Sequence, residues 1–274
     1  MAAAGRTLIA LSDHDTLAGV RELRAAGLGG GSAPGADPTG PRLIGAVEIN
    51  SVTDDPTLWE GELHILGFGM DEADAGFEAA LGRQRAGRTV RIAEMLVRLR
   101  HLGMRVDEAF AAVVAGADPT SIGRPHVARA MIKAGYATSV EDAFARVLGR
   151  GQPGYVPRQG LGPRTAIEAI RAAGGLAVLA HLREAVERQD LIERLVRWGL
   201  GGLEVHYFGS GRPFTTVQVR AMADFASRRG LVATGGSDYH GDEMPYSEST
   251  VDLRVPDAVE GAFLDALETA RRIR

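Results

Sequence analysis

Short apolar runs alternate along this chain with segments of helical spacing, and that alternation restricts the possible folds more than any other feature. TLIAL at 7–11 and GLAVLA at 175–180 have the length of buried strands, whereas 163–173 and 187–198 have helical periodicity. This order is typical of an α/β fold whose strands are buried on both faces. The six expected strands cover 7–11, 42–49, 63–68, 175–180, 202–205 and 231–233. The remaining expected helices of this body cover 18–26, 214–229 and 257–272.

A different pattern occupies the middle of the chain. From residue 71 to about 149, apolar residues recur at three- and four-residue spacing, among them Phe77, Leu81, Met95 and Leu99. We therefore expect a helical subdomain at 71–149, inserted into an α/β body formed by 1–70 and 150–274.

Composition limits the available chemistry. The 274 residues include no cysteine, so any metal must be bound by His, Asp and Glu. The net charge of −4 gives no basic field, and we expect no long duplex nucleic acid as partner. No run of about 18 apolar residues is present, so no membrane partner is expected. The opening MAAAGRT lacks the regions of a signal peptide, and we expect a cytoplasmic protein of open oligomeric state.

Acidic residues and histidines follow the apolar runs. In TGGSDYHG, Asp238 and His240 come just after an expected strand, and glycines would let the chain turn and leave room for a ligand. In SDHDT, His14 lies between Asp13 and Asp15 after another expected strand. Asp15 or Thr16 could instead cap the following helix. Chemistry in α/β folds concentrates at the carboxyl ends of strands, so these residues are candidates for one site.

Five of the seven histidines lie in or beside expected strands, and Glu48 lies inside the apolar run GAVEI. Those histidines are His14, His64, His181, His206 and His240. Each alone is more simply explained as a core or surface residue. Together with Glu48 and Asp238 they form the imidazole and carboxylate set that divalent metals prefer, and multi-metal sites of this kind hydrolyse phosphate esters.

The segment IGRPHVARAMIKAGY at 122–136 begins with signals of a helix start. Arg124 and His126 would lie in its first turn, where free N–H groups favour an anion. The alternative is that Arg124 is a surface charge and His126 a capping or packing residue.

The motifs ALSDHDT, GAVEI, ELHILGFG, VLAH and GGSDYHG resemble those of the polymerase and histidinol phosphatase (PHP) superfamily over nearly the whole chain. The GRPH segment is similar to the branch of 3′,5′-nucleotide bisphosphate phosphatases and 5′→3′ exoribonucleases. The resemblance implies a distorted (β/α)7 barrel with up to three divalent metal ions. Manganese is the expected ion, and zinc, iron(II) and magnesium are alternatives.

The resemblance also implies roles for individual residues. It makes Glu48 a bridging ligand and places Glu48, Asp238 and His240 at the catalytic centre. The full set of implied metal ligands is His14, Glu48, His64, His181, Asp238 and His240.

Further roles follow from the same resemblance. Arg124 and His126 would bind a substrate phosphate, and Asp13 and Asp15 would support the ligands from behind. A ligand role for His206 stays open.

This chain lacks the His-x-His motif with which the family opens, so we expect the first βα unit to be absent. Either the start codon is placed too far downstream or the protein is truncated. Glu48, His64 and His181 could still hold one metal, while the other two ions would lose ligands.

Three functions remain. The leading one is a phosphoric ester hydrolase that uses metal-bound hydroxide on a nucleotide phosphomonoester, such as a 3′,5′-bisphosphate, or on the 5′ end of short oligonucleotides. The second is a small-metabolite phosphatase such as histidinol phosphatase. The third is a non-catalytic remnant that binds phosphorylated ligands.

Overall fold

The computed structural model describes residues 7–28, 41–53, 55, 57–117, 122–209, 213–240, 245–246, 250 and 253–273. Contacts divide the chain into two compact units, Met1–Ala80 with Leu161–Arg274, and Leu81–Gly160. Within the described ranges, no helix combines the length and the apolar character needed to cross a bilayer.

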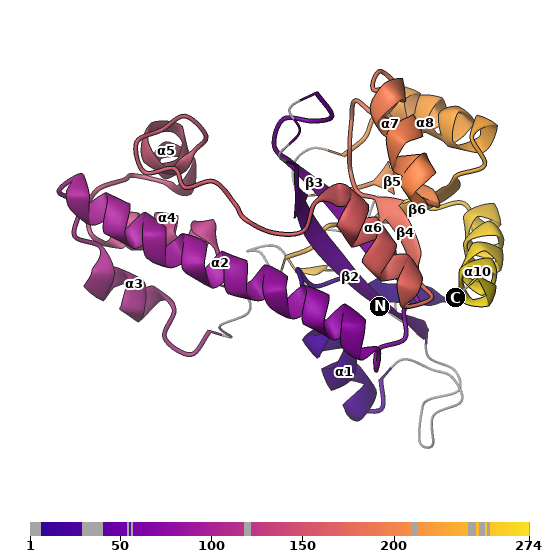
Figure 1. Ribbon diagram of the computed structural model, residues 1–274, viewed down its shortest axis with the longest axis horizontal. Helices are drawn as coiled ribbons and strands as arrows, with labels where there is room; N and C mark the ends of the chain where they lie inside the picture. The colour runs from indigo at the N-terminus through magenta and orange to yellow at the C-terminus, as the bar shows by residue number, and fades with distance from the viewer. Residues whose placement is uncertain are drawn as a thin grey trace. The chain divides into compact units, whose positions relative to one another are not determined.

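The larger unit contains a curled six-stranded sheet, a half-barrel whose strands lie in the order of the sequence (Figure 1). The strands are β1 (Leu8–Leu11), β2 (Arg42–Val52), β3 (Glu62–Phe68), β4 (Leu176–Leu179), β5 (Gly202–Tyr207) and β6 (Val232–Gly236). β1 is parallel to β2, β3 is antiparallel to both of its neighbours, and β4 to β6 are parallel. The α/β fold expected from the sequence is confirmed, and β2, which carries Glu48, pairs in parallel with β1 and in antiparallel with β3.

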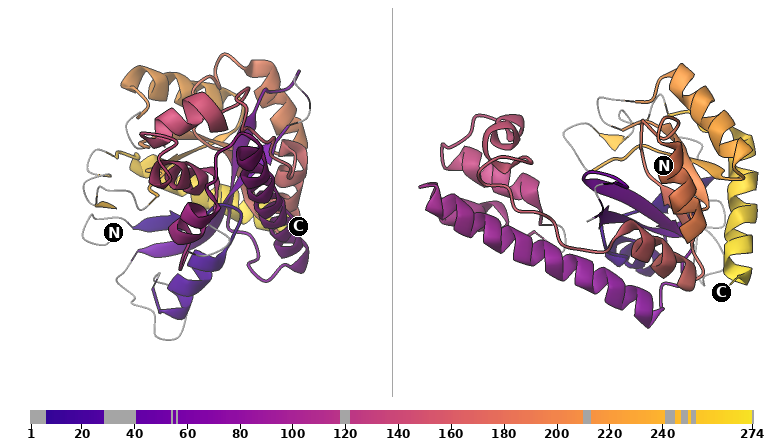
Figure 2. Two further views of the ribbon diagram at one scale, coloured as in Figure 1. Left: turned by 90° about the vertical axis from the view of Figure 1, so that its left-hand side faces the viewer. Right: turned by 45° about the horizontal axis from the view of Figure 1, so that its top comes forward.

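One face of this sheet changes from apolar to polar along its strands. Side chains alternate between the two faces along a strand, so Ile44 and Glu48, four residues apart on β2, point to the same face. Helix α10 (Asp257–Arg272) lies beside the sheet (Figure 2). Its Phe263 and Leu267 belong to the same buried apolar cluster as Ile44. The rings of Phe68 and Phe263 lie edge to face there, with centroids 5.2 Å apart. The apolar end of the face is therefore buried by a helix, and the polar end forms the candidate site.

The other helices of the larger unit pack against the sheet and against each other. They are α1 (Ala18–Ala25), α6 (Pro163–Ala172), α7 (Gln189–Trp198) and α8 (Thr216–Arg228). α6 packs on β2, β3 and β4, and its Ile167 and Ile170 are fully buried, while α8 packs on β5 and β6. At the start of α1 the N-cap position is Leu17, which makes no side-chain capping hydrogen bond, so neither Asp15 nor Thr16 takes the capping position considered for them. The N–H of Ala18 donates to Thr16 Oγ1 at 3.2 Å.

The smaller unit is helical. It contains most of α2 (Ala75–His101), together with α3 (Asp107–Val113), α4 (Arg124–Lys133), α5 (Val140–Ala143) and the π-helical turn η2 (Phe144–Leu148). Met95, Leu99, Val127, Met131 and Leu148 are fully buried in its own apolar core. The unit's bounds, Leu81–Gly160, overlap the helical insertion expected at 71–149.

Candidate metal centre

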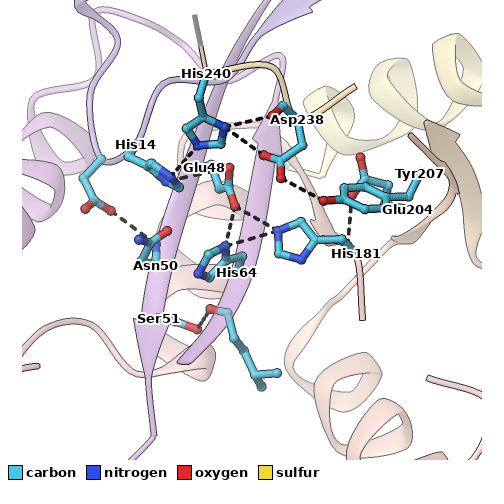
Figure 3. Close-up of polar contacts among 12 residues, drawn as sticks. His14, Glu48, Asn50, Ser51, His64, His181, Glu204, Tyr207, Asp238 and His240 are labelled. Carbon is cyan, nitrogen blue, oxygen red and sulfur yellow. Dashed lines mark hydrogen bonds and ion pairs between the residues drawn. The ribbon is translucent and has the colours of Figure 1, made fainter. Parts of the chain in front are cut away.

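Glu48 lies at the middle of the candidate site, on the polar end of β2. Its Oε1 is 2.6 Å from Nδ1 of His64 and 3.3 Å from Nε2 of His181, while its Oε2 is 3.7 Å from Nδ1 of His14 (Figure 3). The residue is 5% exposed. Each carboxylate oxygen thus faces different imidazoles, which is the arrangement of a carboxylate that can bridge two cations.

The charge of Glu48 is maintained despite its burial. Burial disfavours the ionised form, but hydrogen bonds with His181 and His64 outweigh it and hold the pKa of Glu48 well below its usual range. The side chain is therefore a carboxylate at neutral pH.

The direction of β3 explains how His64 reaches this group. Because β3 is antiparallel to β2, its first residues lie beside the last residues of β2, and His64 pairs with Asn50. His64 Nδ1 is 3.2 Å from Nε2 of His181, which follows β4. One ligand atom each from Glu48, His64 and His181 lies within 4.8 Å of the others, so these three residues could hold one metal ion.

His14 and His240 form the other side of the site. His14 pairs with Glu48 in an isolated parallel bridge beyond the end of β1. His240 Nδ1 donates to the carbonyl oxygen of Asp238 at 2.8 Å. In the neutral imidazole, the lone pair that can bind a metal is then on Nε2. That Nε2 lies 3.3 Å from Nε2 of His14. The two imidazoles are therefore aimed at each other across the site.

The polar atoms here fit divalent cations. Within the described part of the chain, the buried Nδ1 of His14 has no hydrogen-bond partner, and at 3.7 Å it is too far from Glu48 Oε2 for one. His14 Nδ1 and Glu48 Oε2 therefore approach each other without a hydrogen bond between them, as two ligand atoms of one cation would. Imidazole nitrogens and carboxylate oxygens without thiolate suit manganese, iron or zinc.

Two of the three imidazoles beside Glu48 have pKa values shifted in opposite directions. Burial lowers the pKa of His14, and the charge of Glu48 offsets this only in part. Burial also acts to lower the pKa of His181, but its hydrogen bond to Glu48 and the charge of that carboxylate outweigh burial and raise the pKa. Without metal, His14 is therefore ready to bind a cation, whereas His181 must first lose a proton at low pH.

Asp13 and Asp15, expected behind the ligands, join the first loop to β2. The N–H of Asp15 donates to Glu48 O at 2.9 Å, and the N–H of Glu48 donates to Asp13 O at 3.1 Å. The buried Asp15 carboxylate accepts from the N–H of Asn50 at 3.3 Å. The Asp13 carboxylate instead lies at Gly19, where an added Cβ would be 2.2 Å from Oδ2. Asp15 therefore supports the Glu48 segment through its side chain and its backbone, and the backbone carbonyl of Asp13 supports the same segment.

Arg124 and His126 belong to the smaller unit, at the first turn of α4. The N–H of Gly123 donates to His126 Nδ1 at 3.2 Å, so His126 caps this helix. With Nδ1 as acceptor, the proton of the neutral ring is on Nε2. Burial lowers the pKa of His126, with a further contribution from Arg129. The Arg124 guanidinium lies 5.4 Å from the centroid of the Phe144 ring.

Glu204 and Tyr207, both on β5, belong to the site although the sequence interpretation did not select them. Glu204 Oε2 accepts the backbone N–H of His181 at 2.9 Å, and the Tyr207 hydroxyl donates to Asp238 Oδ2 at 2.9 Å. Burial raises the pKa of Glu204 to about 7, partly offset by His181. Burial also raises the pKa of Tyr207, with a further contribution from Asp238. A signal for Glu204 existed, because it interrupts the apolar run GLEV as Glu48 interrupts GAVEI.

Two other histidines, His206 and His101, are not among the residues gathered around Glu48. His206 lies inside β5, and not after a strand ending at Val205 as predicted, because β5 continues to Tyr207. Burial lowers the pKa of His206. His101 is exposed at the end of α2.

Comparison with curated proteins gives relatives that match most of the chain. A 5′-3′ exoribonuclease of Haemophilus influenzae is 32% identical over 87% of this chain and 81% of its own length. A 3′,5′-nucleoside bisphosphate phosphatase of Chromobacterium violaceum is 32% identical over 87% of this chain and 79% of its own length. A phosphoribosyl 1,2-cyclic phosphate 1,2-diphosphodiesterase of Eggerthella lenta is 30% identical over 85% of this chain and 82% of its own length. No protein-family model matches the chain.

Solved structures of similar proteins also match most of the chain. A protein of Bifidobacterium adolescentis, described as a metal-dependent phosphoesterase, has a TM-score of 0.72 and 26% identity over 96% of this chain and 87% of its own. A Chromobacterium violaceum protein, described as an amidohydrolase with bound sulfate and no metal, has a TM-score of 0.72 and 28% identity over 98% of this chain and 88% of its own. The expected function is thus favoured over the small-metabolite phosphatase and the non-catalytic remnant. The chain belongs to the PHP superfamily of metal-dependent phosphoesterases and is a phosphoric ester hydrolase.

Proposed function

We propose that this hydrolase acts on a phosphomonoester of a nucleotide 3′,5′-bisphosphate or on the 5′ end of short oligonucleotides. The observation that supports this most directly is the buried Glu48 carboxylate, whose two oxygens face His14 on one side and His64 with His181 on the other. The names of the relatives support a nucleotide or a ribosyl phosphate as substrate.

The proposed ligands are the six residues gathered at the polar end of the sheet, with Glu48 bridging two ions. They are His14, Glu48, His64, His181, Asp238 and His240. Up to three divalent ions, manganese in the first place, would activate a water molecule and neutralise charge on the phosphoryl group when bound.

The chain's own side chains set the conditions for this chemistry. Glu48 remains ionised because His181 and His64 hydrogen-bond to it in spite of burial. His240 donates from Nδ1 to the Asp238 carbonyl, and this selects the neutral tautomer whose lone pair is on Nε2. These residues therefore present lone pairs to a cation without large rearrangement.

We assign Arg124 and His126 to a second phosphate of the substrate. The first turn of α4 offers backbone N–H groups and the positive end of the helix dipole. His126 caps the helix through Nδ1 and keeps its Nε2–H as a donor, so capping and phosphate binding are compatible. The Arg124 guanidinium supplies the geometry for a two-point contact with phosphate oxygens.

The test is a substrate panel with purified protein, with and without Mn²⁺ after chelator treatment. We expect Mn²⁺-dependent phosphate release from adenosine 3′,5′-bisphosphate and nucleotide release from a 5′-phosphorylated RNA of a few residues. Histidinol phosphate should be a poor substrate. Release only from histidinol phosphate would support the small-metabolite phosphatase instead. Tight binding of the bisphosphate without turnover would support the non-catalytic alternative.

A further inference from the structure

Strand β5 contains one extra residue beside the candidate metal centre. Its pairing with β6 runs Glu204 to Thr234, then His206 to Gly235 and Tyr207 to Gly236, with the register shifted between Glu204 and His206. In a regular strand, residues three apart point to opposite faces. A bulge of one residue restores a common face. Glu204 and Tyr207 consequently both reach the centre (Figure 3).

The glycine pair of the TGGSDYHG motif accommodates this bulge. A Cβ at Gly235 would lie 2.7 Å from Cβ and 2.8 Å from the carbonyl oxygen of His206. A Cβ at Gly236 would lie 2.7 Å from Glu204 Oε1. Both glycines lie within β6, and neither has a positive φ, so they serve close approach and not the sharp turn expected from the sequence.

The two contacts from β5 go to residues with unusual backbone conformations. His181 has φ of +28° and Asp238 has φ of +47°, in the left-handed region that residues other than glycine rarely adopt. Glu204 accepts the backbone N–H of His181, and Tyr207 donates to the Asp238 carboxylate. Conformations of this kind persist only where surrounding contacts impose them.

We propose that Glu204 and Tyr207 are positioning residues of the metal centre: Glu204 fixes the backbone that presents His181, and Tyr207 fixes the carboxylate of Asp238. This inference rests on the proposed function in one respect, that His181 and Asp238 bind metal. Hydrogen bonds that orient ligands raise metal affinity, since the ligands need no ordering when the ion binds. The bulge allows one strand to orient ligands that follow two other strands, β4 and β6.

Three variants test the proposal by Mn²⁺ titration, with thermal unfolding as a second measurement. Glu204→Leu keeps the volume but removes the acceptor, and we expect Mn²⁺ to bind about ten- to a hundredfold more weakly. Glu204→Gln keeps a carbonyl oxygen for the His181 N–H, and we expect Mn²⁺ binding within about threefold of the wild type. Tyr207→Phe removes only the hydroxyl and keeps the ring beside His181, whose centroid is 5.4 Å away; we expect about tenfold weaker binding.

Activity gives a second criterion. With saturating Mn²⁺, Glu204→Leu and Tyr207→Phe should recover most of kcat with an unchanged KM for substrate, because positioning residues act through the ion. The matched control is Leu203→Val, a buried residue of β5 one position before Glu204. It should lower the unfolding temperature and leave the Mn²⁺ Kd unchanged.

Each other outcome overturns the proposal in a recognisable way. Wild-type Kd in both Glu204→Leu and Tyr207→Phe would show that neither residue positions a ligand. Equal losses of Mn²⁺ affinity in Glu204→Gln and Glu204→Leu would show that metal binding needs the charged carboxylate of Glu204, and not only an acceptor for the His181 N–H. If Glu204→Leu does not fold, Tyr207→Phe and Glu204→Gln decide. Failure of the wild type to bind Mn²⁺ would instead refute the proposed function together with this inference.

Discussion

Nε2 of His14 and Nε2 of His240 lie 3.3 Å apart, although 226 residues separate them in the sequence. His14 follows β1 and His240 follows β6, the strands at the two ends of the sheet order. The sheet therefore curls far enough that residues beyond its first and last strands meet above Glu48. Because these contacts are so distant in sequence, the candidate site forms only once the whole sheet has folded.

Replacing Glu48 with Gln should remove most bound metal and nearly all activity. The amide offers only one good ligand oxygen, whereas the two Glu48 oxygens face His14 and the His64–His181 pair separately. We expect Mn²⁺ to bind more than about a hundredfold more weakly, since loss of a direct ligand costs more than loss of an orienting group. Metal analysis after desalting, followed by Mn²⁺ titration, measures the effect.

The matched control for this variant is Glu184→Gln, an exposed carboxylate three positions after His181. Its metal content and activity should equal those of the wild type. Wild-type metal content in Glu48→Gln would show that Glu48 does not bridge the ions.

Mn²⁺ affinity should rise with pH because of His181. Its pKa in the metal-free fold is raised, since Glu48 outweighs the opposing effect of burial, so the imidazole keeps its proton to a higher pH than usual. A cation must displace that proton, and below the pKa the affinity should fall about tenfold per pH unit. His14 contributes little to this dependence because burial lowers its pKa.

Calorimetric titration in buffers of different ionisation enthalpy measures the proton released on binding, and Kd values from pH 6 to 8.5 give the slope. His101→Gln, on the exposed end of α2, is the control and should leave the profile unchanged. A Kd that is constant over this range would mean that His181 is neutral before metal binds.

Arg124→Ala should change substrate selectivity without changing metal content. A lost charge-assisted contact of ~1.5–3 kcal/mol corresponds to roughly ten- to a hundredfold in kcat/KM. The loss should appear with adenosine 3′,5′-bisphosphate and not with p-nitrophenyl phosphate, which has no second phosphate. Lys133→Ala, an exposed residue at the other end of the same helix, is the matched control and should affect neither substrate.

Equal losses of Arg124→Ala on the two substrates would place Arg124 at the scissile phosphate or in the fold of its unit. No loss on either substrate would make it a surface charge, the alternative that its sequence position allows.

Local patterns in the sequence identified much of this architecture. The last helix was predicted with both of its bounds, 257–272, because its spacing and the proline before it are local signals. Four of the predicted ligands lie together for a similar reason, since residues that follow strands of an α/β sheet gather at one edge of it. They are His14, His181, Asp238 and His240. Glu48 was recognisable because a charge inside an apolar run has a high cost of burial without partners.

What the sequence interpretation missed depends on neighbouring strands. An apolar run such as ELHILGF has the same pattern in either direction, so the antiparallel placement of β3 was not predictable from it. The bulge in β5 is a mismatch of one residue against β6, and no single strand encodes it. Tyr207 was missed in consequence, because three-residue spacing on a strand normally places it on the face opposite to Glu204.

Gly235→Ala should destabilise the fold, and Gly261→Ala should not. At Gly235 the new Cβ would meet the Cβ and the carbonyl oxygen of His206, at 2.7 and 2.8 Å, and backbone atoms within a paired strand cannot move aside cheaply. Overpacking of this kind costs about 1–3 kcal/mol. At Gly261, inside α10, nothing lies within 4 Å of the added Cβ, and alanine should stabilise the helix by about 0.5–1 kcal/mol.

Urea unfolding measures the change in the free energy of unfolding in each variant. The two values can be compared directly, because each substitution adds the same methyl group. Gly235→Ala should also weaken Mn²⁺ binding, because moving His206 disturbs the bulge that places Glu204 and Tyr207. A stable Gly235→Ala protein with wild-type Mn²⁺ affinity would mean that β5 adapts without its bulge, and the close approach at His206 would then have no part in forming the site.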